Sequence, residues 1–175
     1  MSGWVLAAVA AVLYLWSRGT GEGEGEAALT REQLIDVARQ EARASGVPEW
    51  LVLANMDVES GIRHLSPRGS GMGRTYYPMG IQTNRGMDLT GLDGEALHDS
   101  LSDAQANIHV GAQEWARIWG EYSPDVDRAR MAWVMPAYAR RGPPYPEKTG
   151  SVATATRLGN WRRAVARWGG PAAVA

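Results

Sequence analysis

Glu59 is the residue of this chain whose type and position best suit acid–base chemistry. It is the only ionised group between Val58 and Gly61, and it follows a largely apolar stretch that begins at Pro48. A proline at the first helical position and a glycine after the last predict a helix with Glu59 in its final turn. There the negative end of the helix dipole and partial burial both favour the neutral acid, which is suited to protonating a leaving oxygen. Taken alone, a glutamate at a helix end is more often a solvated surface residue.

Other polar and aromatic residues of this chain have simpler interpretations. Asp57 lies two positions before Glu59, so the two carboxylates point to different sides of a helix, and Asp57 is predicted to be a surface residue or a helix-end hydrogen-bond partner. His64 and His109 have no second histidine and no cysteine at i+3 to i+5, so no zinc site is expected. Trp115 and Trp119 are one helical turn apart, and core packing is favoured over stacking on sugars.

Four segments of the chain carry motifs in a fixed order. They are Gly-Val-Pro through Glu-Ser-Gly at 46–61, Ser-Pro-Arg-Gly-Ser at 66–70 with Pro-Met-Gly-Ile-Gln at 78–82, Asp-Ala-Gln-Ala-Asn-Ile-His-Val-Gly at 103–111, and Ala-Arg-Met-Ala-Trp at 129–133. In this order the chain resembles the lysozyme-like lytic transglycosylases. That family includes soluble and membrane-bound bacterial enzymes, phage virion muramidases and, more distantly, goose-type lysozyme.

The resemblance implies a mainly α fold, a lysozyme-like helical domain with a cleft. It implies that Glu59 is the sole catalytic acid and base, and that the enzyme cleaves the MurNAc-β-1,4-GlcNAc bond of peptidoglycan with formation of 1,6-anhydroMurNAc. No cofactor and no metal are expected. The motifs, together with the loops expected over the cleft, give the candidate substrate-binding residues Ser66, Tyr76, Tyr77, Gln82, Asn107, Trp133 and Tyr138. For Asn107, a role in capping or orienting a helix next to the cleft is the favoured alternative.

The chain departs from the family pattern in three places. The segment between Glu59 and Gln82 is longer, and Gly80 precedes Gln82 by two residues instead of three. Trp133 stands where the family has tyrosine, although Tyr138 offers a hydroxyl a few residues later. Two alternatives to a lytic transglycosylase therefore stay open. One is a hydrolytic muramidase, and the other is a catalytically weak, peptidoglycan-binding structural protein of a virion.

Charge and composition narrow the function classes. The formal net charge is −1, and the arginine pairs at 140–141 and 162–163 are the only basic clusters, which argues against a nucleic-acid-binding protein. The chain has no cysteine, so disulfides, thiolate catalysis and cysteine metal sites are excluded. The length fits one domain with a core of its own.

The N-terminal part differs in composition from the remainder. Residues 1–17 are predicted to be a transmembrane anchor, because 4–16 are apolar with aromatic residues at both ends, although the run is shorter than the ~20 residues of a usual span. A secretory signal peptide is the competing interpretation. Residues 18–28 are predicted to be a flexible Gly/Glu linker, 29–170 the catalytic domain and 171–175 a tail.

The predicted partners follow from this organisation. They are peptidoglycan glycan strands, a lipid membrane through 4–16, and other virion proteins, with no nucleic acid. Arg18 after the apolar run favours a cytoplasmic catalytic domain by the positive-inside rule, which conflicts with a wall substrate. A virion, with the anchor in an internal membrane or an ejection apparatus, resolves that conflict more easily than a bacterial cell envelope, the other location considered.

Local signals predict the elements around the site. Thr30 and Gln33 form a capping box that starts a helix. Further helices are expected at about 102–119, from Pro124 to Met135, and at about 153–168. A short hairpin is expected between 73 and 88.

Overall fold

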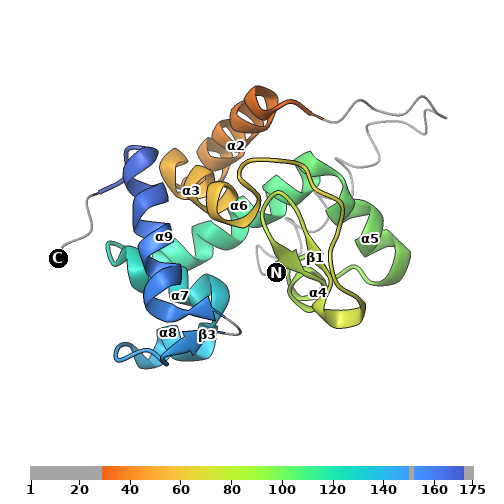
Figure 1. Cartoon of the computed structure of the whole chain (residues 1–175). Coiled ribbons are helices and arrows are strands. Elements are labelled where there is room, and N and C mark those ends of the chain that lie inside the picture. The colour runs from red at the N-terminus through yellow and green to blue at the C-terminus, as the bar shows by residue number, and fades with distance from the viewer. Residues whose placement is uncertain (1–28, 150–151, 172–175) are drawn as a thin grey trace, which may run out of the picture.

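A computed structural model describes residues 29–149 and 152–171, and this part of the chain is mainly helical (Figure 1). The predicted mainly α class is confirmed, whereas the lysozyme-like character of the domain stays a prediction. The helices are α2 (Arg31–Ser45), α3 (Glu49–Ser60), α4 (Thr83–Thr90), α5 (Gly94–Ser102), α6 (Ala104–Tyr122), α7 (Val126–Val134), α8 (Pro136–Arg141) and α9 (Thr154–Arg167), with a 3-10 turn at Gly71–Gly73.

Two short antiparallel hairpins accompany the helices. Strands β1 (Thr75–Tyr76) and β2 (Ile81–Gln82) pair between the 3-10 turn and α4, as predicted for this region. Strands β3 (Lys148–Thr149) and β4 (Val152–Ala153) pair directly before α9, and this hairpin was not predicted. The first hairpin matters most for function because its turn contacts the end of α3.

Helix ends follow the local signals closely. The capping box of Thr30 and Gln33 is present at α2. Gly61 ends α3 in a left-handed conformation with φ of 66°, which glycine adopts at little cost. Pro48 is the N-cap of α3 instead of its first residue, and α7 starts after Asp125 instead of at Pro124.

Helix α6 passes through the middle of the described structure (Figure 1). The hairpin, α4 and α5 lie toward its N-terminal end, and α7, α8 and α9 lie toward its C-terminal end. Helix α2 packs along α6, and α3 packs against both α2 and α9. Because α3 is enclosed in this way, it is apolar on most of its surface, and the two carboxylates of its last turn are Asp57 and Glu59.

Three stacked tryptophans fill the core between α6, α7 and α9. The Trp115 ring is nearly parallel to the rings of Trp133 and Trp161, with centroid distances of 5.0 Å and 5.5 Å. The predicted core role of Trp115 is confirmed, since it is fully buried. Trp119 is partly buried and meets Trp50 edge-on at 5.4 Å.

One glycine of α6 lets the hairpin turn approach this core. A Cβ on Gly111 would lie 2.6 Å from the Met79 methyl carbon, so a side chain at this position would push the turn away. Met79 is fully buried there. The close approach places Gly80, the next residue of the turn, beside α3.

The predicted anchor at 1–17, the linker at 18–28 and the tail residues 172–175 lie outside the described residues. Within the described residues, no helix combines the length and apolar character that a bilayer crossing needs.

Candidate active site

Glu59 is held at the last turn of α3 with one carboxylate oxygen paired and the other open. Its Oε1 accepts a hydrogen bond of 2.7 Å from Nη2 of Arg130 on α7. Among the described residues, no group donates a hydrogen bond to Oε2. The side chain is 20% exposed, so the carboxylate is partly shielded but reachable.

Gly80 forms the wall next to the open oxygen. A Cβ at this position would lie 2.7 Å from Oε2 of Glu59, and the residue has a φ of 76°. Both the space and the backbone conformation therefore require glycine. Gly80 is also part of the wall of a cavity. Glu59 is not one of the wall residues and lies behind Gly80.

This cavity has a volume of about 320 Å³ and lies between the first hairpin, α4, α7 and α9. Its walls are polar on the hairpin and α4 side and more apolar at the end of α7. None of its described wall residues carries a carboxylate; they are Thr75, Gly80, Gln82, Arg85, Trp133, Val134, Met135 and Arg157.

A buried chain of hydrogen bonds fixes the turn that carries Gly80. Asn107 accepts from the Met79 amide at 2.8 Å, and Asn55 donates to the Met79 carbonyl at 3.0 Å. Asn55 in turn accepts from Nη1 of Arg130 at 2.7 Å. Both asparagines are fully buried. The hairpin turn and the Glu59 carboxylate are therefore linked through the same arginine.

The position of Asn107 favours its orienting role over substrate binding. Its amide nitrogen donates to the Leu101 carbonyl at 3.2 Å, and the side chain has no exposed surface. Because a fully buried side chain does not reach a ligand in the cavity, Asn107 acts on the site through Met79.

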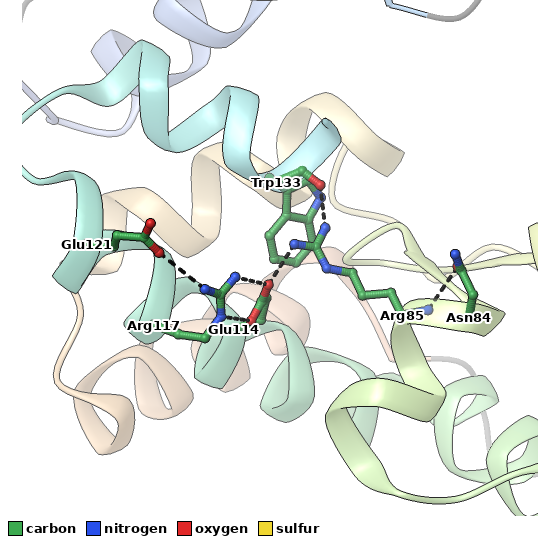
Figure 2. A network of polar contacts seen from close by, with 6 residues as sticks. All are labelled: Asn84, Arg85, Glu114, Arg117, Glu121 and Trp133. Carbon is green, nitrogen blue, oxygen red and sulfur yellow. Dashed lines mark hydrogen bonds and ion pairs between the residues drawn. The ribbon is translucent and has the colours of Figure 1, made fainter. Parts of the chain in front are cut away.

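Trp133 lies at the cavity wall, but only 4% of its surface is exposed. Its ring stacks on Trp115, and the Arg85 guanidinium lies 4.6 Å from its ring centroid. Arg85 also donates to the Trp133 carbonyl (Figure 2). With its ring covered by these neighbours, Trp133 does not offer a ligand a stacking platform.

Glu114 of α6 anchors Arg85 from behind (Figure 2). Its Oε1 accepts from Arg85 at 2.7 Å, and Arg117 donates to both of its oxygens at 2.8 Å. Burial opposes ionisation, but the hydrogen bonds and charges of Arg117 and Arg85 outweigh it and hold the pKa of Glu114 below its usual range. Arg85 is therefore held firmly at the cavity wall.

Arg157 brings a second guanidinium to the cavity, from α9. Burial and the nearby charge of Arg130 lower the pKa of Arg157, whereas Glu59 opposes that change. The cavity thus has arginines on two sides and a carboxylate behind Gly80.

Of the remaining residues predicted to bind substrate, only Gln82 is at the cavity wall, where it is exposed. Tyr76 is 3% exposed, and its hydroxyl lies 3.3 Å from Nδ1 of His98, so its side chain belongs to the core. Ser66 is exposed on the loop before the hairpin, outside the cavity wall.

Two tyrosines predicted to bind substrate lie beside arginines. Tyr77 is half-buried, with the Arg68 guanidinium 5.9 Å from its ring centroid. Tyr138 is half-buried on α8, with Arg141 at 5.6 Å. Neither is part of the cavity wall, so Tyr138 does not offer its hydroxyl there in place of the family tyrosine.

Asp57 has the role expected of a hydrogen-bond partner near a helix end. It accepts from Nη1 of Arg167 at 2.6 Å and from Nε1 of Trp168 at 3.2 Å, and so ties α3 to the end of α9. This confirms that Asp57 is a hydrogen-bond partner near a helix end.

Four members of the site were not predicted from the sequence: Arg130, Asn55, Arg85 and Arg157. Asn55 had a usable signal, because it is a lone amide inside an apolar helical stretch, and a buried amide needs partners.

Comparison of this chain with models of known protein families, with curated proteins and with solved structures finds no match.

Proposed function

We propose that this protein is a peptidoglycan lytic transglycosylase that cleaves the MurNAc-β-1,4-GlcNAc bond. The observation that carries the proposal is the Glu59 carboxylate, which keeps one oxygen open behind Gly80, a wall residue of a cavity whose described wall has no carboxylate. A glycosidase that uses two carboxylates needs a partner within about 5–10 Å across the substrate. A single acid instead suits a substrate that supplies its own nucleophile, as the acetamido sugars of peptidoglycan do.

The chemistry uses Glu59 twice. As an acid it protonates the glycosidic oxygen while the bond from that oxygen to C1 of MurNAc breaks, and the substrate acetamide stabilises the cationic C1. As a carboxylate it then takes the proton of the 6-hydroxyl, whose oxygen bonds to C1. The proton that Glu59 gave is thereby returned, and the product is a 1,6-anhydro sugar. Arg130 stabilises the carboxylate between the two steps.

The cavity wall supplies groups that suit such a substrate. The exposed Gln82 amide is able to bind hydroxyl or acetamide groups. Arg85 and Arg157 place positive charge where the carboxylates of MurNAc and its peptide would be attracted.

The setting of the enzyme is part of the proposal. A membrane anchor at 4–16 and a Gly/Glu linker would tether the domain near a glycan layer. This suits a phage protein that opens the wall locally, from an internal membrane or an ejection apparatus and beside other virion proteins. An envelope protein of a bacterium is the alternative location.

Mass spectrometry of digested sacculi tests the function directly. Wild-type protein should release fragments with 1,6-anhydroMurNAc ends, and Glu59→Gln should release none. Reducing ends would instead establish a hydrolytic muramidase. Binding to sacculi without release of any fragment, at several pH values, would refute the enzymatic proposal in favour of a structural virion protein.

A further inference from the structure

Arg130 is the only described residue that donates a hydrogen bond to Glu59. Its side chain is 3% exposed and bridges two acceptors on α3, with Nη1 to Asn55 and Nη2 to Glu59, both at 2.7 Å. The guanidinium carbon lies 5.5 Å from the centroid of the Trp161 ring. Because the guanidinium is planar and rigid, two fixed contacts determine the direction of the carboxylate it holds.

The third guanidinium nitrogen of Arg130, Nε, bears on the orientation of the side chain. Its Nε is buried and has no hydrogen-bond partner among the described residues. A buried donor without a partner is destabilising, and such a group calls for an explanation. Arg130 is therefore oriented so that Nη1 and Nη2 donate to Asn55 and Glu59, while its Nε has no partner among the described residues.

The same arginine also connects Glu59 to the wall that faces it. Asn55 accepts from Arg130 and donates to the Met79 carbonyl, and Gly80 follows Met79 in the turn. A shift of Arg130 would move the carboxylate and the turn relative to each other. Arg130 itself is not part of the cavity wall, so it acts on a ligand only through these neighbours.

We propose that Arg130 is a positioning residue, which fixes Oε1 of Glu59 and so directs Oε2 past Gly80 toward the scissile bond. This inference rests on the proposed function, since it concerns the orientation of the carboxylate of Glu59, the proposed catalytic acid. Arg130 is a residue of the fourth motif, but neither the resemblance nor the chemistry of an acid assigns it a role. Lysine is a poor replacement, since one ammonium point charge does not reproduce the planar bridge.

The experiment compares kcat and KM of Arg130→Met and Arg130→Lys on purified glycan strands. Arg130→Met should lower kcat about 100-fold, the size of effect that a misplaced reacting group produces, and leave KM within about threefold. Arg130→Lys should recover only part of kcat. The matched control is Arg128→Met on the same helix, whose guanidinium contacts the Ala139 carbonyl and Tyr122 instead, and its kcat should stay near wild type.

A further variant keeps the test decisive if Arg130→Met does not fold. Asn55→Ala retains the Arg130–Glu59 contact and removes the second anchor, so its kcat should fall by about tenfold, less than that of Arg130→Met. Wild-type kcat in folded Arg130→Lys and Asn55→Ala would overturn the inference. If these variants are active while Glu59→Gln is dead, only the role of Arg130 is wrong. If Glu59→Gln itself stays active, the proposed function has failed.

Discussion

Two glutamate–arginine pairs lie near the cavity, and their exposures are reversed. Each joins a carboxylate Oε1 to an arginine Nη2 at 2.7 Å. In the first pair the Arg130 side chain is 3% exposed and Glu59 is 20% exposed. In the second the Glu114 side chain is 4% exposed and Arg85 is 19% exposed. In each pair the buried residue holds the more exposed one in place. Arg130 holds Glu59, and Glu114 holds Arg85 at the cavity wall.

The two carboxylates also differ in how fully they are used. Arg117 and Arg85 occupy both oxygens of Glu114, whereas Arg130 occupies one oxygen of Glu59. A carboxylate with both oxygens engaged by arginines contributes to stability and has little capacity left for acid–base chemistry. We therefore expect mutations in the two pairs to have different effects. A mutation of Glu59 should reduce catalysis, and a mutation of Glu114 should reduce folding stability.

The largest effect should come from Glu59→Gln. This change removes the proton donor and acceptor while keeping shape, so activity on purified sacculi should fall to nearly nothing with the melting temperature little changed. A loss of less than tenfold, about 1.4 kcal/mol in barrier height, would contradict the assignment. Asp57→Asn is the matched control two residues away and should cost little activity, because Asp57 is engaged by Arg167.

Glu114→Leu should give the largest loss of stability. It leaves the partly buried Arg85 without its carboxylate, and breaking a buried pair in this way costs about 3–5 kcal/mol of unfolding free energy. Urea unfolding measures the change. Glu121→Leu removes the other, half-exposed partner of Arg117 and should cost no more than about 1 kcal/mol. Equal effects of the two changes would refute the difference in burial as their cause.

Part of the loss of folding stability at acidic pH should come from protonation of Glu114. The folded-state pKa of Glu114 lies below the ordinary pKa of a glutamate, so its contribution to stability is complete above that ordinary value and is lost as pH falls through the folded value. Urea midpoints measured across the acid range should decline toward low pH in the wild type. In Glu114→Leu the decline should be shallower. Parallel curves for the two proteins would contradict the lowered pKa.

Trp133→Phe should have the smallest effect of this series. The shorter ring keeps part of the stack on Trp115 and part of the contact with Arg85, so a loss of about 1–2 kcal/mol in stability is expected. Turnover should change little, because the ring of Trp133 is covered by these neighbours. A strong rise in KM with unchanged stability would show that this ring binds substrate after all.

Features set by neighbours in the chain were predictable from the sequence. The capping box at Thr30, the end of α3 at Gly61 and the placement of Glu59 in the last turn of α3 each depend on a few adjacent residues. The short hairpin was also found where its turn residues indicated. These features hold because capping and backbone conformation are local interactions.

Features set by packing between distant segments were not predictable. Tyr76 was expected to contact a ligand, but it is buried against His98, since nothing in a loop sequence shows which way its side chains turn. Trp133 was placed at the site by its position in a motif, yet its ring is covered by residues of α4 and α6.

The order of residues along the chain was enough to predict that a glutamate ends an apolar helix, that a glycine-containing turn follows it, and that the fold is mainly helical. It did not predict that Arg130, 71 positions after Glu59, is its partner, nor that Gly80 lies beside its other oxygen. A helix end is specified within one turn of the chain, whereas an ion pair between α3 and α7 exists only once the core has fixed the distance between them.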